Sequence, residues 1–172
     1  MKKKKKNLKV PKSMRKKFKE QRRFKKSINE SQEKLLQRAR ERVDDNKFEF
    51  EISPASRKKM SEIITEFAAP LLDAANNFED QKKAISIAIA IWNISLLPEE
   101  NQSQSLKEIE SIVSSSTEGD DFPKVRQEIF SYLIYRKNHL FQDIKRFVQD
   151  YEIFETSEGL YLNIASIMLS GK

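Results

Sequence analysis

The longest apolar run in the chain, residues 84–98, reads AISIAIAIWNISLLP and constrains the fold more than any other stretch. As a strand it would place its isoleucines on one face, whereas as a helix it would be apolar on nearly every side. We predict a helix, because the run is long for a strand, small residues separate the isoleucines, and Pro98 ends it where a helix would stop. A helix that is apolar all round belongs in the middle of a bundle. Ser86, Asn93 and Ser95 interrupt the run, which is also shorter than the roughly 20 apolar residues that span a bilayer.

Charge is divided unevenly along the 172-residue chain. Residues 1–26 contain 15 of the 33 lysines and arginines but only one of the 26 acidic residues, so this segment carries +14 and the remainder carries −7. Like charges at this density keep a segment from collapsing on its own. We therefore predict a disordered basic arm over residues 1–26, followed by an acidic body.

The basic arm interleaves aromatic residues with its cations, a pattern that suits phosphates and unpaired bases. The candidate nucleic-acid-binding residues are Arg15, Lys16, Lys17, Phe18, Arg22, Arg23, Phe24, Lys25 and Lys26. We expect RNA or single-stranded DNA as the ligand, and we expect residues 13–24 to become helical when a polyanion neutralises them. Two other interpretations remain, namely a solvated tail and a tail that folds back onto the acidic body.

Helix signals divide most of the remaining chain. Residues 27–30 have the S-x-x-E form of a capping box, which begins a connecting helix that continues to about Val43. Residues 48–52 then alternate apolar and acidic side chains as a short extended segment. Further helices are predicted over residues 54–75 with a kink at Pro70, residues 77–97, residues 98–113 and residues 123–137. In the last of these helices Tyr132 and Tyr135 are expected to lie inward or nearly so.

The end of the sequence has a different character. Residues 146–155 and 160–168 are rich in aromatic and β-branched side chains and are joined by the polar connection T-S-E-G, which predicts a β-hairpin. In the second run, alternation places Leu160, Leu162 and Ile164 on one face of the strand. It places Tyr161, Asn163 and Ala165 on the opposite face. An isolated hairpin is marginal in water, so we expect it to pack on the helices, with residues 48–52 as its candidate third strand.

These patterns together define the expected fold. It is α+β and predominantly α: a helical bundle of about four helices with a C-terminal β-hairpin, preceded by a basic N-terminal arm. The expected divisions are the arm at residues 1–26, a connecting helix with a short extended segment at residues 27–52, and the helical domain with its hairpin at residues 53–172.

The sequence predicts no catalytic, metal-binding or cofactor-binding residues. It contains no cysteine and only three glycines, so it offers neither a thiolate metal site nor a glycine-rich phosphate loop. The only histidine, His139, lies four residues before Asp143, but two ligands do not make a convincing metal site, so we predict an ordinary surface histidine. We expect no enzyme and no cofactor. An enzyme whose site is not visible in the sequence is the remaining alternative.

Five large side chains would form an apolar groove for a partner's helix or strand if they were exposed. They are Leu71, Leu72, Trp92, Tyr132 and Tyr135. We predict instead that all five belong to the core. The N-terminus lacks the apolar segment of a secretory signal, so we expect a cytoplasmic protein without a membrane partner.

Three segments carry a resemblance to a known group of proteins. Residues 67–72 (FAAPLL), residues 91–98 (IWNISLLP) and residues 146–151 (RFVQDY), the last before a closing hairpin, resemble an uncharacterised family of small bacterial, mostly helical proteins with a Trp-Asn-x-Ser-Leu-Leu-Pro motif. The resemblance spans about residues 58–168. It implies the order of elements and no activity, cofactor or site residues.

The leading hypothesis from the sequence is a non-enzymatic binding or adaptor protein. Its basic arm would bind RNA or another polyanion, with residues 1–26 as the contact for RNA or single-stranded DNA, while the acidic helical body would contact a protein. The alternative is a protein–protein interaction module with no nucleic-acid role.

Overall fold

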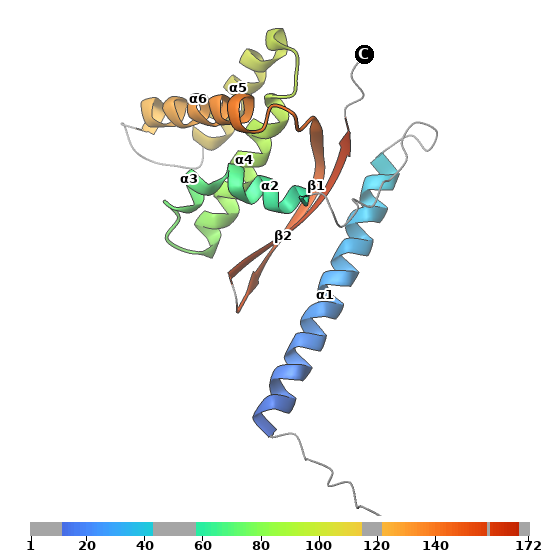
Figure 1. The fold of residues 1–172 in the computed structure, drawn as a ribbon. Helices are drawn as coiled ribbons and strands as arrows, with labels where there is room; N and C mark the ends of the chain where they lie inside the picture. The colour runs from blue at the N-terminus through green and yellow to red at the C-terminus, as the bar shows by residue number, and fades with distance from the viewer. Residues whose placement is uncertain (1–11, 43–57, 115–121, 158, 169–172) are drawn as a thin grey trace, which may run out of the picture.

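The computed structural model describes residues 12–42, 58–114, 122–157 and 159–168, and Figure 1 shows their arrangement. Within these ranges the elements follow in the order α1 (Lys12–Arg42), α2 (Met60–Phe67), α3 (Ala69–Leu72), α4 (Phe78–Ile94), α5 (Glu99–Ser114), α6 (Phe122–Leu140), β1 (Arg146–Thr156) and β2 (Gly159–Met168). The two strands pair antiparallel as a C-terminal hairpin. The fold is therefore α+β and predominantly α, as the sequence predicts.

Helix α4 is the centre of the body. It begins after Asn77, whose side-chain oxygen accepts a hydrogen bond from the backbone N–H of Asp80 at 2.9 Å. Its residues Ile85, Ile91 and Trp92 are fully buried. Elements α2, α3, α5, α6 and β1 all pack against it. The predicted central helix is confirmed, although its last helical residue is Ile94 and a short turn leads to Pro98.

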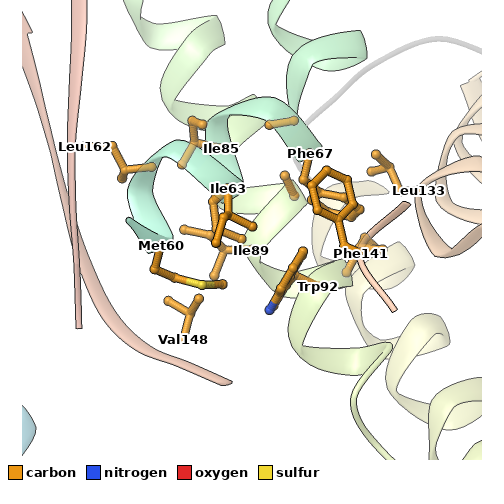
Figure 2. Close-up of a cluster of buried hydrophobic side chains, with 14 of the residues drawn as sticks. Met60, Ile63, Phe67, Ile85, Ile89, Trp92, Leu133, Phe141, Val148 and Leu162 are labelled. Atoms are coloured by element: carbon orange, nitrogen blue, oxygen red, sulfur yellow. The ribbon is translucent and has the colours of Figure 1, made fainter. Parts of the chain in front are cut away.

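Three aromatic rings form a cluster within the core (Figure 2). The rings of Phe67, Trp92 and Phe141 meet edge to face, with centroid separations of 5.2, 5.8 and 5.9 Å. The Trp92 indole N–H donates a hydrogen bond to the backbone oxygen of Arg146 at 2.8 Å. One side chain therefore joins α4 to α2, to the end of α6 and to the start of β1.

The single kinked helix expected over residues 54–75 is instead two short helices. Helix α2 begins at Met60, after Lys59 in an extended conformation, and ends at Phe67; Pro70 lies in the first turn of α3. Proline has no N–H to donate to the carbonyl four residues earlier, which here is that of Glu66. The guanidinium of Arg136 donates to this oxygen at 3.1 Å, so the break also ties α2 to α6. Residues 54–57 lie outside the described ranges.

The hairpin packs one face, its inner face, on α2 and α4. The β2 residues Leu160, Leu162 and Ile164 join the core cluster, as alternation predicts. On β1 the pairing register shifts between Val148 and Asp150, and this irregularity lets both Val148 and Tyr151 contact the core. The expected third strand, residues 48–52, lies outside the described ranges.

The side chain of Asn93 holds β1 against the C-terminal end of α4. Its amide NH₂ donates to the backbone oxygen of Val148 at 2.8 Å, and its amide oxygen accepts from the backbone N–H of Val148 at 2.9 Å. This pair of bonds imitates a neighbouring strand at an edge position of the hairpin. The adjacent residues Trp92 and Asn93 thus both fix β1.

Helix α1 lies along the other face of the hairpin, its outer face (Figure 1). It is one continuous helix from Lys12 to Arg42, so the disordered arm expected over residues 1–26 is wrong for residues 12–26. The boundary expected between residues 26 and 27 falls within this helix. Residues 1–11 lie outside the described ranges.

Two tyrosines of α6 face solvent rather than the core. Tyr132 and Tyr135 are 48% and 57% exposed, which corrects the expectation that they lie inward, whereas Trp92 is fully buried as predicted. His139 is exposed, as predicted, and its ring stacks on that of Tyr135 with centroids 3.9 Å apart. Among the described residues, no three metal-ligating side chains form a cluster, and no helix is long and apolar enough to cross a membrane.

Candidate nucleic-acid interface

All nine candidate nucleic-acid-binding residues lie on α1. Cations follow the spacing of one helical face across its first four turns, at positions 12, 15, 16, 19, 22, 23 and 26. At about 100° per residue these positions occupy an arc of about 120°, and at 1.5 Å per residue they span about 21 Å. We call them the basic face.

The described side chains of the basic face point into solvent. Lys16, Lys19, Arg22, Arg23 and Lys26 are all exposed. The candidates Lys17, Phe18, Phe24 and Lys25 occupy helical positions away from this arc. The side chains of Arg15, Lys17 and Phe18 lie outside the described part of the chain. The structure thus gathers a part of the candidate set onto one face and separates the rest from it.

A second face of α1 contacts the hairpin. Its contacts begin at Phe24, whose ring meets that of Tyr161 edge to face at 5.9 Å between centroids. They continue with Leu35, which is buried and packs with Ala165 of β2. The residues of this docking face share the spacing i, i+4, i+7, i+11 and i+14: Phe24, Ile28, Ser31, Leu35 and Arg38.

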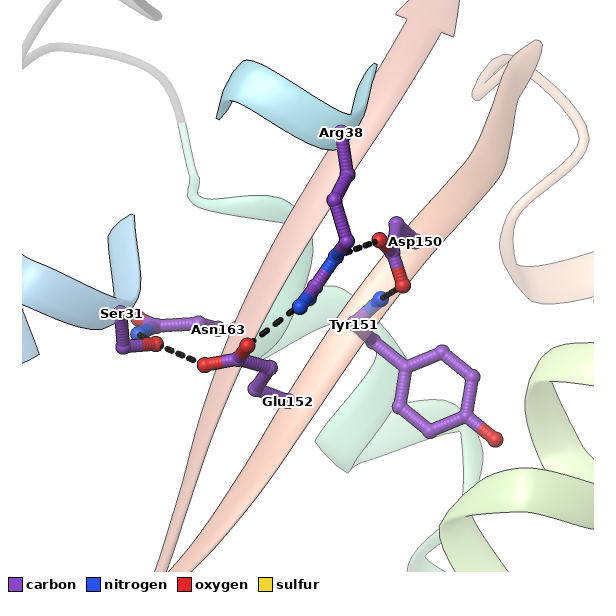
Figure 3. Close-up of polar contacts among 6 residues, drawn as sticks. All are labelled: Ser31, Arg38, Asp150, Tyr151, Glu152 and Asn163. Carbon is purple, nitrogen blue, oxygen red and sulfur yellow. Dashed lines mark hydrogen bonds and ion pairs between the residues drawn. The ribbon is translucent and has the colours of Figure 1, made fainter. Parts of the chain in front are cut away.

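Polar side chains form the strongest directional contacts of the docking face (Figure 3). The guanidinium of Arg38 donates from Nε to Asp150 at 2.7 Å and from Nη2 to Glu152 at 2.8 Å. Glu152 also accepts a hydrogen bond from the hydroxyl of Ser31, which in turn accepts one from the amide of Asn163 at 3.0 Å. These hydrogen bonds to Asp150 and Glu152 raise the pKa of Arg38 above its ordinary value. The contact between α1 and the hairpin therefore depends on an arginine that stays charged at physiological pH.

The described cations of the basic face differ from Arg38, because no ion pair with a described residue of the body is found for them. Among the described side chains, no ion pair joins Lys16, Lys19, Arg22 or Arg23 to an acid of the hairpin or the helical bundle. Lys26 lies 3.6 Å from Glu30 on the same helix, an exposed pair of little energetic weight. In Figure 1 the N-terminal part of α1 continues past the hairpin, away from the body. Within the described part of the chain, Lys16, Lys19, Arg22 and Arg23 are therefore exposed to another molecule.

The orientation of the basic face follows from the docking face. The centres of the two faces lie roughly 140° apart around the helix, since successive residues are about 100° apart. Docking by residues 24–38 therefore turns the cations toward solvent. Sequence reasoning missed the docking face because the capping-box pattern at residues 27–30 suggested a new helix there; reading the apolar spacing across Ser27 would have found it.

No family model, no curated protein and no solved structure matches this chain. The resemblance to a family of small bacterial helical proteins stays a prediction.

Proposed function

We propose that this is a non-enzymatic nucleic-acid-binding protein, in which the basic face of α1 contacts the phosphate backbone. The observation that supports the proposal is the separation of the two faces on one helix. The acids that face α1 from the hairpin, Asp150 and Glu152, are both engaged by Arg38. Among the described residues, no ion pair joins the described cations from Lys16 to Arg23 to the body, and such an array attracts phosphates through counterion release.

The expected preference for RNA or single-stranded DNA depends on aromatic residues among the cations. Phe24 is 38% exposed and is engaged by Tyr161 of the hairpin. The ring of Phe24 therefore helps to hold α1 on the hairpin, and this contact makes it less available for stacking on a base. Phosphate contact is the part of the hypothesis that the geometry favours.

A second role, protein contact by the helical body, is favoured by one specific observation. Tyr132, Tyr135 and Leu140 of α6 are large side chains that are about half exposed or more. Tyrosine is enriched at protein interfaces because its ring buries a large area and its hydroxyl stays hydrated. In this adaptor role, α1 binds nucleic acid and the body binds a protein.

The proposal is tested by removing three charges from the basic face of the intact chain. In the variant Lys19→Gln/Arg22→Gln/Arg23→Gln, we expect affinity for labelled nucleic acid to fall at least about 10-fold at 0.15 M salt. The slope of log affinity against log salt should become shallower by about 0.7–0.9 for each phosphate that the variant no longer neutralises. Fluorescence anisotropy with single-stranded RNA, duplex RNA and duplex DNA measures both quantities.

The matched control removes three exposed lysines of the body, in the variant Lys83→Gln/Lys107→Gln/Lys145→Gln. Its net charge equals that of the basic-face variant. Any difference in nucleic-acid affinity between the two variants therefore reflects where the removed charges lie and not how many were removed. Equal losses in both variants would contradict the proposal. So would a parent protein that binds nucleic acid only at low salt.

A further inference from the structure

We infer that the basic face of α1 binds double-helical DNA by entering its major groove, an inference that rests on the proposed nucleic-acid function. Three features of α1 lead to it: the length of helix before the docking contacts, the division of its cations into two rows, and the absence of aromatic residues from the arc of its basic face. Each is independent of the net charge of the chain.

The first feature is the length of helix at the N-terminal end of α1. Among the described side chains, docking contacts of α1 with the hairpin occupy residues 24–38, and residues 12–23 precede them in the same continuous helix. These twelve residues make about three turns and about 18 Å of helix. An α-helix with its side chains is about 10–12 Å wide, and the major groove of B-form DNA is about 12 Å wide. Residues 12–23 of α1 therefore form a helix whose width matches that of the groove.

The second feature is the arrangement of cations within the basic face. At about 100° per residue, positions 15, 22 and 26 lie along one edge of the arc and positions 12, 16 and 23 along the other, with position 19 between them. A helix in the major groove has a phosphate backbone on each side of it. Each row of cations would face one backbone, whereas a single strand would engage one row.

The third feature is the position of the aromatic residues of α1 around the helix, relative to the basic face. Proteins that hold single strands combine cations with exposed aromatic rings on which successive bases stack. At the positions of the basic face the chain has only lysine and arginine, and Phe24 lies on the docking face against Tyr161. Within its arc the basic face therefore carries phosphate-binding groups and no aromatic residue, since Phe18 and Phe24 both lie outside the arc, and this favours a duplex over a single strand.

The test compares nucleic acids of one sequence with the intact protein at 0.15 M salt. We expect B-form duplex DNA to bind at least about 10-fold more tightly than the single strand. We also expect it to bind more tightly than duplex RNA, whose charge density is similar but whose major groove is too narrow to admit a helix. Bulky substituents at C5 of the pyrimidines fill the major groove and should weaken binding at least about 10-fold, while a ligand that fills the minor groove should not.

Single substitutions connect this preference to the two rows. Arg22→Gln and Arg23→Gln, one from each row, should each reduce affinity for duplex DNA, whereas Lys25→Gln, away from the basic face, should have little effect. A single strand that binds as tightly as the duplex would overturn the inference, as would equal binding to the C5-substituted duplex. In either case the proposed function stands if binding still depends on the basic face. If the protein bound none of these nucleic acids at 0.15 M salt, both the inference and the proposed function would be overturned.

Discussion

The two faces of the hairpin are held in different ways. Its inner face contributes Val148, Ile153 and Leu162 to the apolar core with α2 and α4. Its outer face holds α1 through Arg38 and Ser31, with a smaller apolar contact around Leu35. The inner face depends on buried area, which is not directional, and the outer face on a few directional charged hydrogen bonds.

This difference indicates that α1 is a separable part of the molecule. Apolar burial changes little with salt, whereas partly exposed charge pairs weaken as salt rises. An interface of this polar kind resembles the contacts between domains, for which relative motion is the ordinary expectation. The body should therefore stay folded when α1 is released. The basic face would then lose its fixed orientation.

The largest effect is expected from a change on the inner face. Leu162 is buried among α2, β1 and the core cluster, so Leu162→Ala should lower the free energy of unfolding of the body by about 2–5 kcal/mol. Urea denaturation followed by the fluorescence of Trp92, the only tryptophan, measures this change.

The neighbouring residue on β2 provides the matched control. Tyr161 points to the outer face and contacts Phe24 of α1. Tyr161→Ala should change the unfolding of the body much less than Leu162→Ala, because the ring it removes contacts Phe24 of α1 and Phe154 of β1 and not the core. Equal destabilisation by the two substitutions would show that both faces belong to one cooperative unit, contrary to the comparison.

An intermediate effect is expected from Glu152, which accepts hydrogen bonds from both Ser31 and Arg38. Removing the charge in Glu152→Gln should increase the undocked population of α1 about 10-fold, since it weakens the hydrogen bonds that Glu152 accepts from Ser31 and Arg38. Limited trypsin digestion measures the change, because α1 contains many lysines and arginines. Cleavage within α1 should become about 10-fold faster while the melting temperature of the body stays nearly the same.

Glu155→Gln is the control for that substitution, because Glu155 is an exposed glutamate on the same strand. It should leave the rate of cleavage unchanged. If Glu152→Gln instead unfolds the body together with α1, the outer face is as essential to the fold as the inner one. Higher salt should also speed cleavage of the parent protein and have less influence on Glu152→Gln.

The elements that sequence reasoning predicts correctly have local signals. Alternation marks both strands of the hairpin, Asn77 caps α4, and the apolar run of α4 identifies the centre of the body. Alternation also assigns Tyr161 and its neighbours of the same parity to the face away from the core. These features depend on residues close together in the chain.

The errors arise where distant contacts override a local pattern. The charge of residues 12–26 predicts disorder, but they continue a helix that the hairpin holds further along. Asp150 and Glu152 reach α1 because the register shift after Val148 changes the alternation of β1, and no local sequence signal announces that shift. Tyr132 and Tyr135 fall beside an apolar stripe, and only the packing of α6 decides that they face solvent.

The smallest effect on stability is expected from Lys137, a buried cation in the body beside Trp92. Its side chain is 3% exposed; its ammonium donates to the backbone oxygen of Phe141 at 2.9 Å and lies 4.7 Å from the ring centroid of Trp92. Burial lowers the pKa of Lys137 below its ordinary value; the nearby charge of Lys145 lowers it further, and Asp143 opposes the change.

The sign of the pH dependence follows from that lowered pKa. Between the pKa of the folded state and the ordinary value, the unfolded chain binds more protons, so the free energy of unfolding rises with pH. Below both values the buried charge costs stability, and this cost is constant. Lys137→Met removes the titrating group and should flatten the rise in stability that the parent shows as the pH approaches the ordinary lysine pKa of about 10.4 from below, as urea denaturation at several pH values would show. The exposed Lys83→Met should keep the slope of the parent.

This slope also sharpens the comparison between the two faces. Lys137 lies in the body beside Trp92, away from the contacts that hold α1. The slope should therefore persist in Glu152→Gln, where α1 is released, and disappear in Lys137→Met, where α1 stays docked. If releasing α1 removes the slope, the two faces are energetically coupled through the hairpin, and α1 is part of the body's folding unit rather than a separable helix.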